Sequence, residues 1–241
     1  MKEWRWKLEN FEGGIKMKTL LISDIHGNHE ALKTILKKEN YEQIYCLGDI
    51  VDYGPSNQEC IELIKKEADL VVKGNHDNAV AHGIDCGCGY ELKDLSQQVR
   101  KKTLKEIGEK SKRFLAELPI TLKEQDCFLA HASIDDLFKY LKPETPEKQF
   151  TEFKEIDEDV IILGHTHIPM DRTIFGKRFI NPGSLGQPRD EDPRAAYAVL
   201  KNGEIEFKKQ EYDIEKVIEN MKEKDYPERA IRILQKGKVV P

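Results

Sequence analysis

The sequence predicts an α/β protein with a parallel sheet at its start and a second, strand-rich part after it. Two observations carry this prediction. Between residues 18 and 73, short runs of branched aliphatic residues alternate with amphipathic stretches of helical period, which is typical of a βαβαβ unit with parallel strands and right-handed crossovers. After residue 120, short apolar runs bounded by turn residues dominate and indicate mainly strands.

The first half is interpreted as three strands and two helices in alternation, followed by a helical segment. Between residues 92 and 118 an apolar residue recurs every three or four positions, which predicts one long or broken helix that ends before Pro119. The region near 84–118 is therefore expected to be a helical insert. The alternating elements are predicted as strands near 18–23, 43–47 and 70–73, and as helices near 29–38 and 57–67.

The second half contains six predicted strands and a final helix. Asp213 is expected to be the N-cap of that helix, because Ile214, Val217, Ile218 and Met221 recur on one helical face after it. The strands are expected to form a second sheet and are predicted near 120–122, 127–130, 160–163, 173–180, 195–200 and 205–209.

Residues 17–241 are expected to form a single domain, and residues 1–16 are interpreted as an N-terminal extension outside it. Met17 stands directly before the first predicted strand, whereas the segment ahead of it shows no clear period. The stretch Glu12-Gly13-Gly14 can be encoded as a ribosome-binding site at a suitable distance from Met17. The extension is therefore a candidate for a non-native segment.

Composition narrows the class of partner and the compartment. The formal net charge of −5 argues against stable binding to nucleic acid or to a membrane surface, since such proteins usually carry a basic excess. The chain has no apolar run long enough to span a bilayer and no signal-peptide apolar region at its start, so we expect a cytoplasmic protein. Five scattered cysteines, an odd number, fit a reducing compartment.

Five apolar runs each end on residue types that bind metals. In open α/β sheets, ligands bind beyond the carboxyl ends of the strands, so these polar tips are expected to meet at one edge. Together they supply a mixed nitrogen and oxygen set large enough for two metal ions, although each segment alone is more often an ordinary turn. The segments are Asp24-Ile25-His26, Gly48-Asp49, Gly74-Asn75-His76, His131 and Gly164-His165-Thr166-His167.

Read in order, these segments resemble the signature of the calcineurin-like metallophosphoesterase superfamily, and the resemblance runs from residue 17 through at least residue 186. A closer likeness to a prokaryotic cytoplasmic branch of phosphodiesterase-like proteins rests on residues 48–55 and 181–190. The resemblance implies a four-layer αββα sandwich of two mixed β-sheets flanked by helices. It also implies a site with two divalent transition-metal ions.

Carried over residue by residue, the resemblance assigns seven metal ligands. Mixed ligation of this kind suits Mn or Fe, with Zn, Co or Ni as alternatives, better than an all-oxygen magnesium or calcium cage. The implied reaction is attack of a metal-bridging hydroxide on phosphorus. One ion is assigned to Asp24, His26, Asp49 and His167, and the other to Asp49, Asn75, His131 and His165, so that Asp49 bridges the two.

The resemblance also assigns residues around the metals. His76 is expected to give a proton or a hydrogen bond to the leaving oxygen, with Asp52 orienting its imidazole. Asp77 is interpreted as a helix cap. The residues predicted to bind substrate are Asn181, Ser184 and Arg189.

Three classes of function follow, with a metal-dependent phosphodiesterase acting on a small or nucleotide-like substrate as the leading one. The related phosphoprotein phosphatases carry a phosphate-clamping Arg where this chain has Tyr53, and a phosphodiester depends less on that clamp. Arg189 and Arg172 are candidates to replace it. The alternatives are a phosphomonoesterase or dinucleoside-polyphosphate hydrolase, and a non-catalytic scaffold, which the complete ligand set disfavours.

The remaining histidines and the paired cysteines of the insert are interpreted without a chemical role. His29 and His82 are expected to be solvated. Cys86 and Cys88 could form half of a zinc site or a redox pair, but the sequence offers no second pair at suitable spacing. We therefore interpret both as plain thiols.

Overall fold

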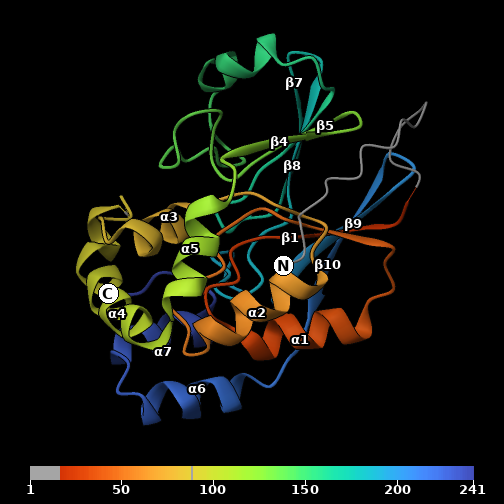
Figure 1. Cartoon of the computed structure of the whole chain (residues 1–241). Helices are drawn as coiled ribbons and strands as arrows, with labels where there is room; N and C mark the ends of the chain where they lie inside the picture. Colours follow the sequence, from red (N-terminus) through yellow and green to blue (C-terminus); the bar gives the residue numbers. More distant parts are fainter. Residues whose placement is uncertain (1–16, 88) are drawn as a thin grey trace.

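The computed structural model describes residues 17–87 and 89–241, which form two five-stranded sheets with helices around them (Figure 1). The first sheet has the strand order β10-β9-β1-β2-β3, and the second has the order β4-β5-β6-β8-β7. The predicted extension, residues 1–16, and Cys88 lie outside the described residues.

The first sheet begins with the predicted βαβαβ unit, which the structure confirms. The strands β1, β2 and β3 are parallel, with Leu20 opposite Ile44 and Tyr45 opposite Leu70. Asn28 caps the first helix, since its side chain accepts a hydrogen bond from the backbone N–H of Ala31. The elements are β1 (Thr19–Ile22), α1 (His29–Lys38), β2 (Gln43–Cys46), α2 (Asn57–Glu67) and β3 (Leu70–Val71).

Two strands of the later half join the first sheet, which corrects the expectation that all of them would form the second. Strand β9 (Ala195–Lys201) pairs antiparallel with β1, and β10 (Glu204–Gln210) pairs antiparallel with β9. Residues 195–200 of β9 are all buried, as expected for a strand with a partner on each side. The local pattern identifies such a strand, but it does not identify its partner.

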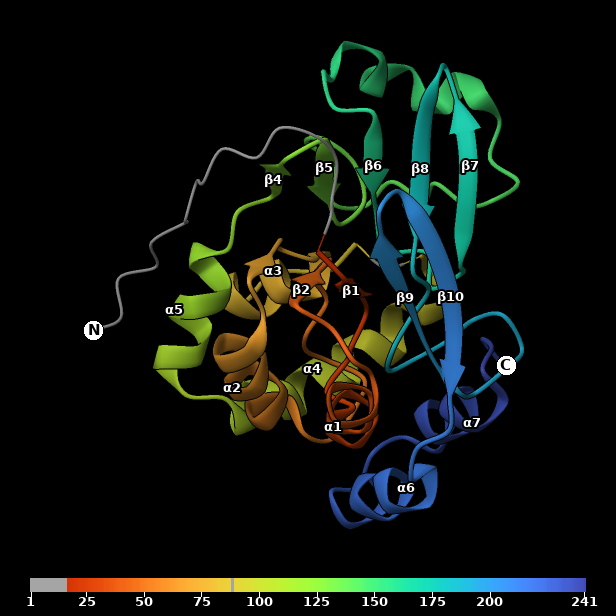
Figure 2. The same cartoon turned by 90° about the vertical axis from the view of Figure 1, so that its right-hand side faces the viewer.

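The second sheet contains the other predicted strands, with one correction. Residues 173–180 form a hairpin instead of one strand, because Phe175 (φ 52°) and Gly176 (φ 80°) make a two-residue turn with left-handed backbone. Figure 2 shows β7 and β8 side by side. The strands are β4 (Thr121–Glu124), β5 (Cys127–Ala130), β6 (Val160–Ile162), β7 (Met170–Ile174) and β8 (Lys177–Asn181).

Alternation of side chains along the strands builds the layers. Leu20 and Ile22 of β1 pack against the α1 and α2 side of the first sheet, whereas Leu21 points the other way and packs with Leu129 and Ile162 of the second sheet. The outer face of the second sheet is covered by a 3₁₀ helix, η2 (Glu147–Glu155). The predicted four-layer αββα order is confirmed, and its fourth layer is this 3₁₀ helix.

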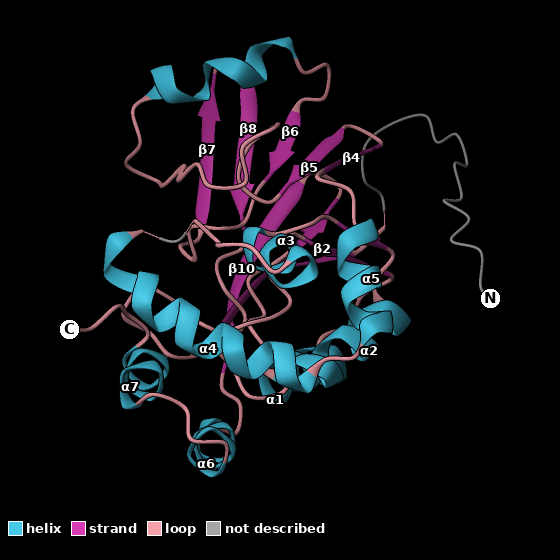
Figure 3. Cartoon of the chain, turned by 60° about the vertical axis from the view of Figure 1, so that its left-hand side comes forward, coloured by secondary structure: helices cyan, strands magenta, loops and turns pink. Residues whose placement is uncertain are grey.

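The predicted helical stretch after β3 is a broken helix, with the break at Ile107 and Gly108. The first part of this broken helix, α4, packs against the C-terminal helices α6 and α7 (Figure 3). Helix α7 was not predicted. Asp213 accepts a hydrogen bond from Lys216 N, which confirms the predicted cap of α6. These elements are α3 (Asn75–His82), η1 (Tyr90–Leu92), α4 (Lys93–Glu106), α5 (Glu109–Glu117), α6 (Ile214–Glu223) and α7 (Glu228–Lys236). Among the described residues, no helix has the length and apolar character needed to cross a membrane.

Glu39, at the end of α1, should make stability depend on pH. Partial burial would raise its pKa, but hydrogen bonds from Lys208, Lys18 and Tyr197 outweigh burial and lower the pKa from 4.5 to about 2. Because the folded-state pKa is depressed, this stabilisation is present above about pH 4.5 and is lost as the pH falls towards 2. We expect Glu39→Gln to lower the free energy of unfolding by about 1–2 kcal/mol at pH 7 and by nearly nothing at about pH 2.

The measurement is urea unfolding of wild type and Glu39→Gln across this pH range. The difference between the two proteins removes the contribution of other acidic groups. Exposed Glu62→Gln on α2 serves as the control and should show no such pH-dependent difference. A difference between wild type and Glu39→Gln that stays constant with pH would contradict the role assigned to the Glu39 carboxylate.

Candidate metal centre

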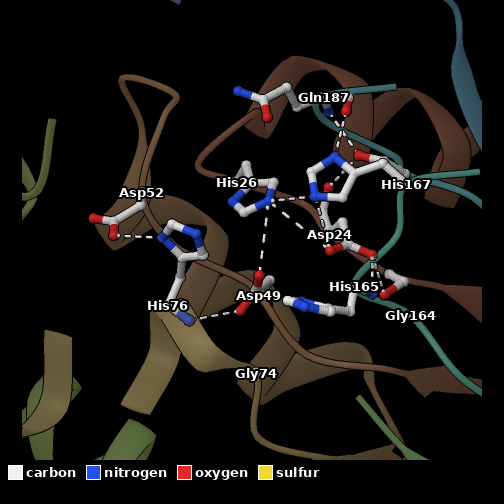
Figure 4. A network of polar contacts seen from close by, with 12 residues as sticks. Asp24, His26, Asp49, Asp52, Gly74, His76, Gly164, His165, His167 and Gln187 are labelled. Atoms are coloured by element: carbon white, nitrogen blue, oxygen red, sulfur yellow. Dashed lines mark hydrogen bonds and ion pairs between the residues drawn. The ribbon is translucent and has the colours of Figure 1, made fainter. Parts of the chain in front are cut away.

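The structure brings together the polar residues that follow five strands. Asp24 and His26 follow β1, Asp49 follows β2, and Asn75 follows β3, and all are buried. The ligand atoms of six of the predicted metal ligands form two groups, within each of which all of them lie within 4.8 Å of one another. Figure 4 shows side chains of both groups around Asp49. The first group is Asp24, His26 and His167, and the second is Asp49, His131 and His165.

The loops that carry these ligands have an unusual backbone. Asp24 (φ 52°), His26 (φ 48°), Asp49 (φ 54°), His165 (φ 66°) and His167 (φ 61°) are all left-handed, a conformation that non-glycine residues adopt at a cost. Hydrogen bonds between neighbouring loops hold them there, including Asp24 N to Gly48 O at 3.0 Å and Gly164 N to His131 O at 2.8 Å. The ligand positions are therefore imposed by the sheet edge.

Three histidines have their protonation pattern fixed by backbone carbonyls. His26 Nδ1 donates to Val51 O at 3.0 Å, His131 Nδ1 to Leu47 O at 2.5 Å, and His167 Nδ1 to Gln187 O at 2.5 Å. A carbonyl oxygen only accepts, so the proton of each neutral ring sits on Nδ1 and the lone pair on Nε2.

The Nε2 atoms of His26 and His167 lie 3.2 Å apart, with their lone pairs directed into the same space. Burial, reinforced by His167, lowers the pKa of His26 to about 3, so the ring is neutral. Two neutral imidazoles at this distance repel each other through their lone pairs unless positive charge lies between them. The pair therefore fits a shared cation.

The oxygen donors are oriented in the same way. Asp24 Oδ2 accepts from Ser23 Oγ at 2.6 Å and from His165 N at 3.1 Å, while its Oδ1 has no hydrogen-bond partner in the described part of the chain. Asn75 donates its amide to Cys86 O at 2.8 Å, which turns its Oδ1 towards His131 Nε2 at 3.2 Å. Donors that share one ion at about 2.1 Å lie roughly 3.0–3.4 Å apart. The distance of 3.2 Å between Asn75 Oδ1 and His131 Nε2 therefore fits metal coordination.

Asp49 lies between the two groups. Its Oδ2 is 3.2 Å from His131 Nε2 and 3.8 Å from His26 Nε2, and its Oδ1 accepts from His76 N at 2.8 Å. Burial alone would lower the pKa of His131, but Asp49 raises it to about 9, so the carboxylate favours positive charge at this point. The Asp49 carboxylate would stabilise a metal cation in the same way.

Gly74 lets the chain pass directly over Asp49. A Cβ at position 74 would lie 2.0 Å from Asp49 Oδ1 and 2.3 Å from Asp49 N. We expect Gly74→Ala to displace this carboxylate and to lower both metal content and kcat/KM, the latter by about 100-fold. Gly108→Ala is the matched control, because a Cβ there has nothing within 4 Å. Full metal content and activity in Gly74→Ala would contradict the requirement for this close approach.

Asp77 supports the ligand loops, and its predicted role as a helix cap is confirmed. Its carboxylate accepts from Gly74 N at 3.0 Å at the start of α3, and also from Asp49 N at 2.8 Å and Ile50 N at 2.9 Å. Burial, followed by the nearby Asp49 carboxylate, raises the pKa of Asp77 to about 6. One side chain thus joins the loop after β2 to the helix that carries Asn75.

His76 lies beside the metal groups and is held by Asp52. The distance from His76 Nδ1 to Asp52 Oδ2 is 2.8 Å, and the same oxygen accepts from Arg100 Nε at 2.8 Å and from Arg100 Nη2 at 2.5 Å. Burial would raise the pKa of Asp52, but His76 and Arg100 outweigh it, so the carboxylate is ionised. Arg100 also donates to Ile84 O at 2.9 Å, which ties α4 to the site.

Sequence reasoning missed Arg100. The available signal was a charged residue directly after Val99, within the apolar stretch of a helix, and both residues are buried. It also missed Tyr140, whose ring lies 4.1 Å from that of His165 between centroids, and nothing in the local sequence marks this residue.

The three predicted substrate residues occupy different settings. Asn181 is fully buried and donates to Gly164 O, and Ser184 is fully buried and donates to Asp24 O at 2.8 Å. These contacts favour a supporting role for both. Arg189 is half-buried beside the site, and its Nη2 donates to Gln187 Oε1 at 3.2 Å. Arg172 instead donates to the carbonyls of Pro143 and Thr145.

The side chains interpreted without a chemical role lie away from the ligand groups or are buried. His29 is half-buried at the start of α1, and His82 is exposed at the end of α3. Cys86 is buried, and its backbone carbonyl accepts a hydrogen bond from the side-chain amide of Asn75. Cys88 lies outside the described residues.

The chain is similar to known phosphoesterases in sequence and in fold. The sequence profile of the calcineurin-like phosphoesterase superfamily domain matches residues 17–204. The uncharacterized protein MJ0912 of Methanocaldococcus jannaschii is 34% identical over 89% of this chain and 96% of its own length. Phosphodiesterase YfcE of Escherichia coli is 27% identical over 77% of this chain and 88% of its own. The crystal structure of a metallophosphoesterase from Sphaerobacter thermophilus superposes with a TM-score of 0.81 at 29% identity, covering 92% of this chain and 99% of that one.

Proposed function

Because the chain belongs to the calcineurin-like phosphoesterase superfamily, we propose that it is a binuclear metal-dependent phosphodiesterase acting on a small or nucleotide-like substrate. The observation that carries the proposal is the position of Asp49, whose Oδ2 faces His131 on one side and His26 on the other. A carboxylate between two groups of imidazole and oxygen donors suits a pair of transition-metal ions.

The seven ligands divide between the two sites as the family resemblance implies. When bound, the ions would acidify a water molecule and place positive charge beside the substrate phosphate. Asp24, His26 and His167 would hold one ion, and Asn75, His131 and His165 the other, with Asp49 shared. The carbonyl partners of His26, His131 and His167 orient these rings before any ion binds.

His76 would assist departure of the leaving group. Its Nδ1 faces the ionised Asp52, so the proton shared with substrate must be carried on Nε2. Asp52 fixes the ring orientation, and Arg100 fixes Asp52 through two hydrogen bonds to one oxygen. Arg100 is in this scheme a positioning residue for the general acid.

Tyr53 supports a preference for phosphodiesters. Its ring lies 4.9 Å from the rings of both His26 and His76, so an uncharged side chain occupies this part of the site. The nearby Arg100 is already engaged by Asp52. At this position a monoester dianion would lack the two-pronged guanidinium contact that stabilises its extra charge, whereas a diester monoanion needs it less.

The test is metal analysis of the purified protein followed by a substrate screen with added Mn. We expect about two transition-metal ions per chain and a higher kcat/KM on bis-p-nitrophenyl phosphate than on p-nitrophenyl phosphate. Faster turnover of the monoester, or of dinucleoside polyphosphates alone, would replace the phosphodiesterase assignment with the corresponding hydrolase. Absence of metal and of any turnover would overturn the proposed function altogether.

Arg100 gives a prediction of its own. We expect Arg100→Gln to lower kcat about tenfold with little change in KM, since only the general acid is misoriented. Arg100→Lys should recover part of the loss, because it restores the charge without the planar fork. The loss of kcat should be larger on alkyl esters than on nitrophenyl esters. A general structural defect would not produce this difference between substrates. Exposed Lys101→Gln on the same helix is the control.

A further inference from the structure

A cavity of about 540 Å³ lies beside the metal centre. We call it the Tyr140 pocket. Proteins bind ligands of nucleotide size in cavities of about 300–1,000 Å³. The residues that define it here are Leu92, Tyr140, Lys142, Ile168, Arg189 and Val239.

The pocket adjoins the metal centre through residues that contact or neighbour the predicted ligands. Tyr140, in its wall, lies against the ring of His165, with 4.1 Å between the two centroids. Thr166, also in its wall, is the residue between His165 and His167. Arg189 N donates to His167 O at 3.4 Å. The pocket is therefore within reach of a substrate whose scissile phosphate lies at the metal ligands.

The pocket combines apolar and cationic groups. Leu92, Ile168 and Val239 supply aliphatic surface, and Tyr140 supplies an aromatic ring. Lys142 and Arg189 supply two positive charges. Among the described residues of this lining, Glu91 is the one acidic residue, and its side chain is exposed. The ligand group that matches is apolar and planar in one part and anionic in another.

The segment that carries Tyr140 and Lys142 is held in place. Lys142 N donates to Thr145 Oγ1 at 2.9 Å, and Arg172 Nη1 donates to Pro143 O and Thr145 O, each at 2.8 Å. Backbone that is fixed in this way lowers the entropy lost when a ligand binds. Arg172 thus contributes to this wall through the backbone and not through its charge.

We propose that the Tyr140 pocket is a nucleotide subsite, which binds the nucleoside of a substrate together with a second phosphate besides the one being hydrolysed. The nucleoside contacts the aliphatic wall and Tyr140, and the second phosphate contacts Lys142 and Arg189. This inference rests on the proposed function, since the scissile phosphate is placed at the metal ligands. It narrows the substrate class to nucleotides that carry at least two phosphates.

The test measures the affinity of three probes for the full chain loaded with Mn. Two of the probes carry a methylene-bridged diphosphate, which resists hydrolysis, and the third carries no diphosphate. They are α,β-methylene-ADP, methylenediphosphonate, which lacks the nucleoside, and AMP, which lacks the second phosphate. We expect α,β-methylene-ADP to bind at least about tenfold more tightly than either of the others in titration calorimetry. Equal affinities for all three would overturn the subsite.

Charge variants test the wall itself. Lys142→Ala should lower the affinity for α,β-methylene-ADP about tenfold. Glu91→Gln should raise this affinity, because the substitution removes a negative charge that repels the ligand. Exposed Lys148→Ala on η2, outside this lining, is the control. If Lys142→Ala behaves like Lys148→Ala, the assignment of Lys142 is wrong.

Hydrolysis of bis-p-nitrophenyl phosphate separates this inference from the proposed function. A wild-type enzyme that hydrolyses this diester but binds the three probes alike keeps its phosphodiesterase role and loses the nucleotide subsite. A protein that binds no Mn and hydrolyses no phosphoester loses the proposed function first.

Discussion

Asp49→Asn is expected to abolish hydrolysis while the fold survives. The Asp49 carboxylate faces His131 at 3.2 Å and His26 at 3.8 Å, so its charge acts on both proposed metal sites. Burial would raise its pKa, but His131 and the other nearby imidazoles hold the pKa well below its usual range, and the group is an anion. Asparagine keeps the size but removes the negative charge that two cations share.

The measurement is steady-state kinetics with metal analysis on the same preparation. We expect kcat to fall by at least about 10³-fold, as for loss of a major electrostatic contact in a catalytic site, and metal content to fall below that of wild type. Circular dichroism should still show the folded protein. Asp126→Asn, in the exposed turn between β4 and β5, is the matched control. An Asp49→Asn enzyme with two metals and near-normal turnover would refute the bridging role.

His76→Ala is expected to keep its metals and to lose activity in a way that depends on the substrate. General acid assistance is worth about 10²- to 10⁴-fold, and it matters most when the departing alkoxide is strongly basic. A nitrophenolate departs without a proton. We therefore expect a large loss of kcat on alkyl or nucleoside esters and a small loss on nitrophenyl diesters.

The controls separate proton donation from other roles of His76. His82→Ala, at the exposed end of the same helix, should leave both activities within about twofold, as for surface substitutions away from special features. Asp52→Asn should show a milder form of the same substrate bias, because it misorients the imidazole without removing it. Equal losses on both ester types, or a missing metal in His76→Ala, would make His76 a ligand or a phosphate-binding group.

The parts of the fold that the sequence predicted are those with strong local signals. Helix α1 follows an Asn cap and repeats apolar residues at helical spacing, and its predicted bounds match the structure. The proposed metal ligands could be located because each follows a strand. These strands belong to both sheets, β1, β2 and β3 to the first and β5 and β6 to the second, and the segments after them meet at the site. In contrast, the partners of β9 and the hairpin at Phe175 depend on pairing between strands, which local pattern does not specify.

The residues that the sequence analysis missed show a second limit of prediction from sequence. Helix α7 carried readable signals, since Pro227 precedes it, Gly237 ends it, and Ile231 and Leu234 share one face. Arg100 and Tyr140 differ, because their importance comes from contacts across long stretches of chain. Arg100 contacts Asp52, which lies 48 residues earlier in the chain, and the ring of Tyr140 contacts that of His165. Only the folded arrangement brings such pairs together.

The left-handed backbone at the site bears on how evolution has balanced stability against activity. Seven of the twelve described non-glycine residues with positive φ lie here, including Asp52 at 70° and Tyr53 at 61°. Selection for folding alone would favour glycine at such positions, since it takes this conformation without steric penalty. Side chains persist there at a thermodynamic disadvantage. Stabilising substitutions at these seven positions should therefore cost catalysis, which makes the rest of the scaffold the proper target for engineering.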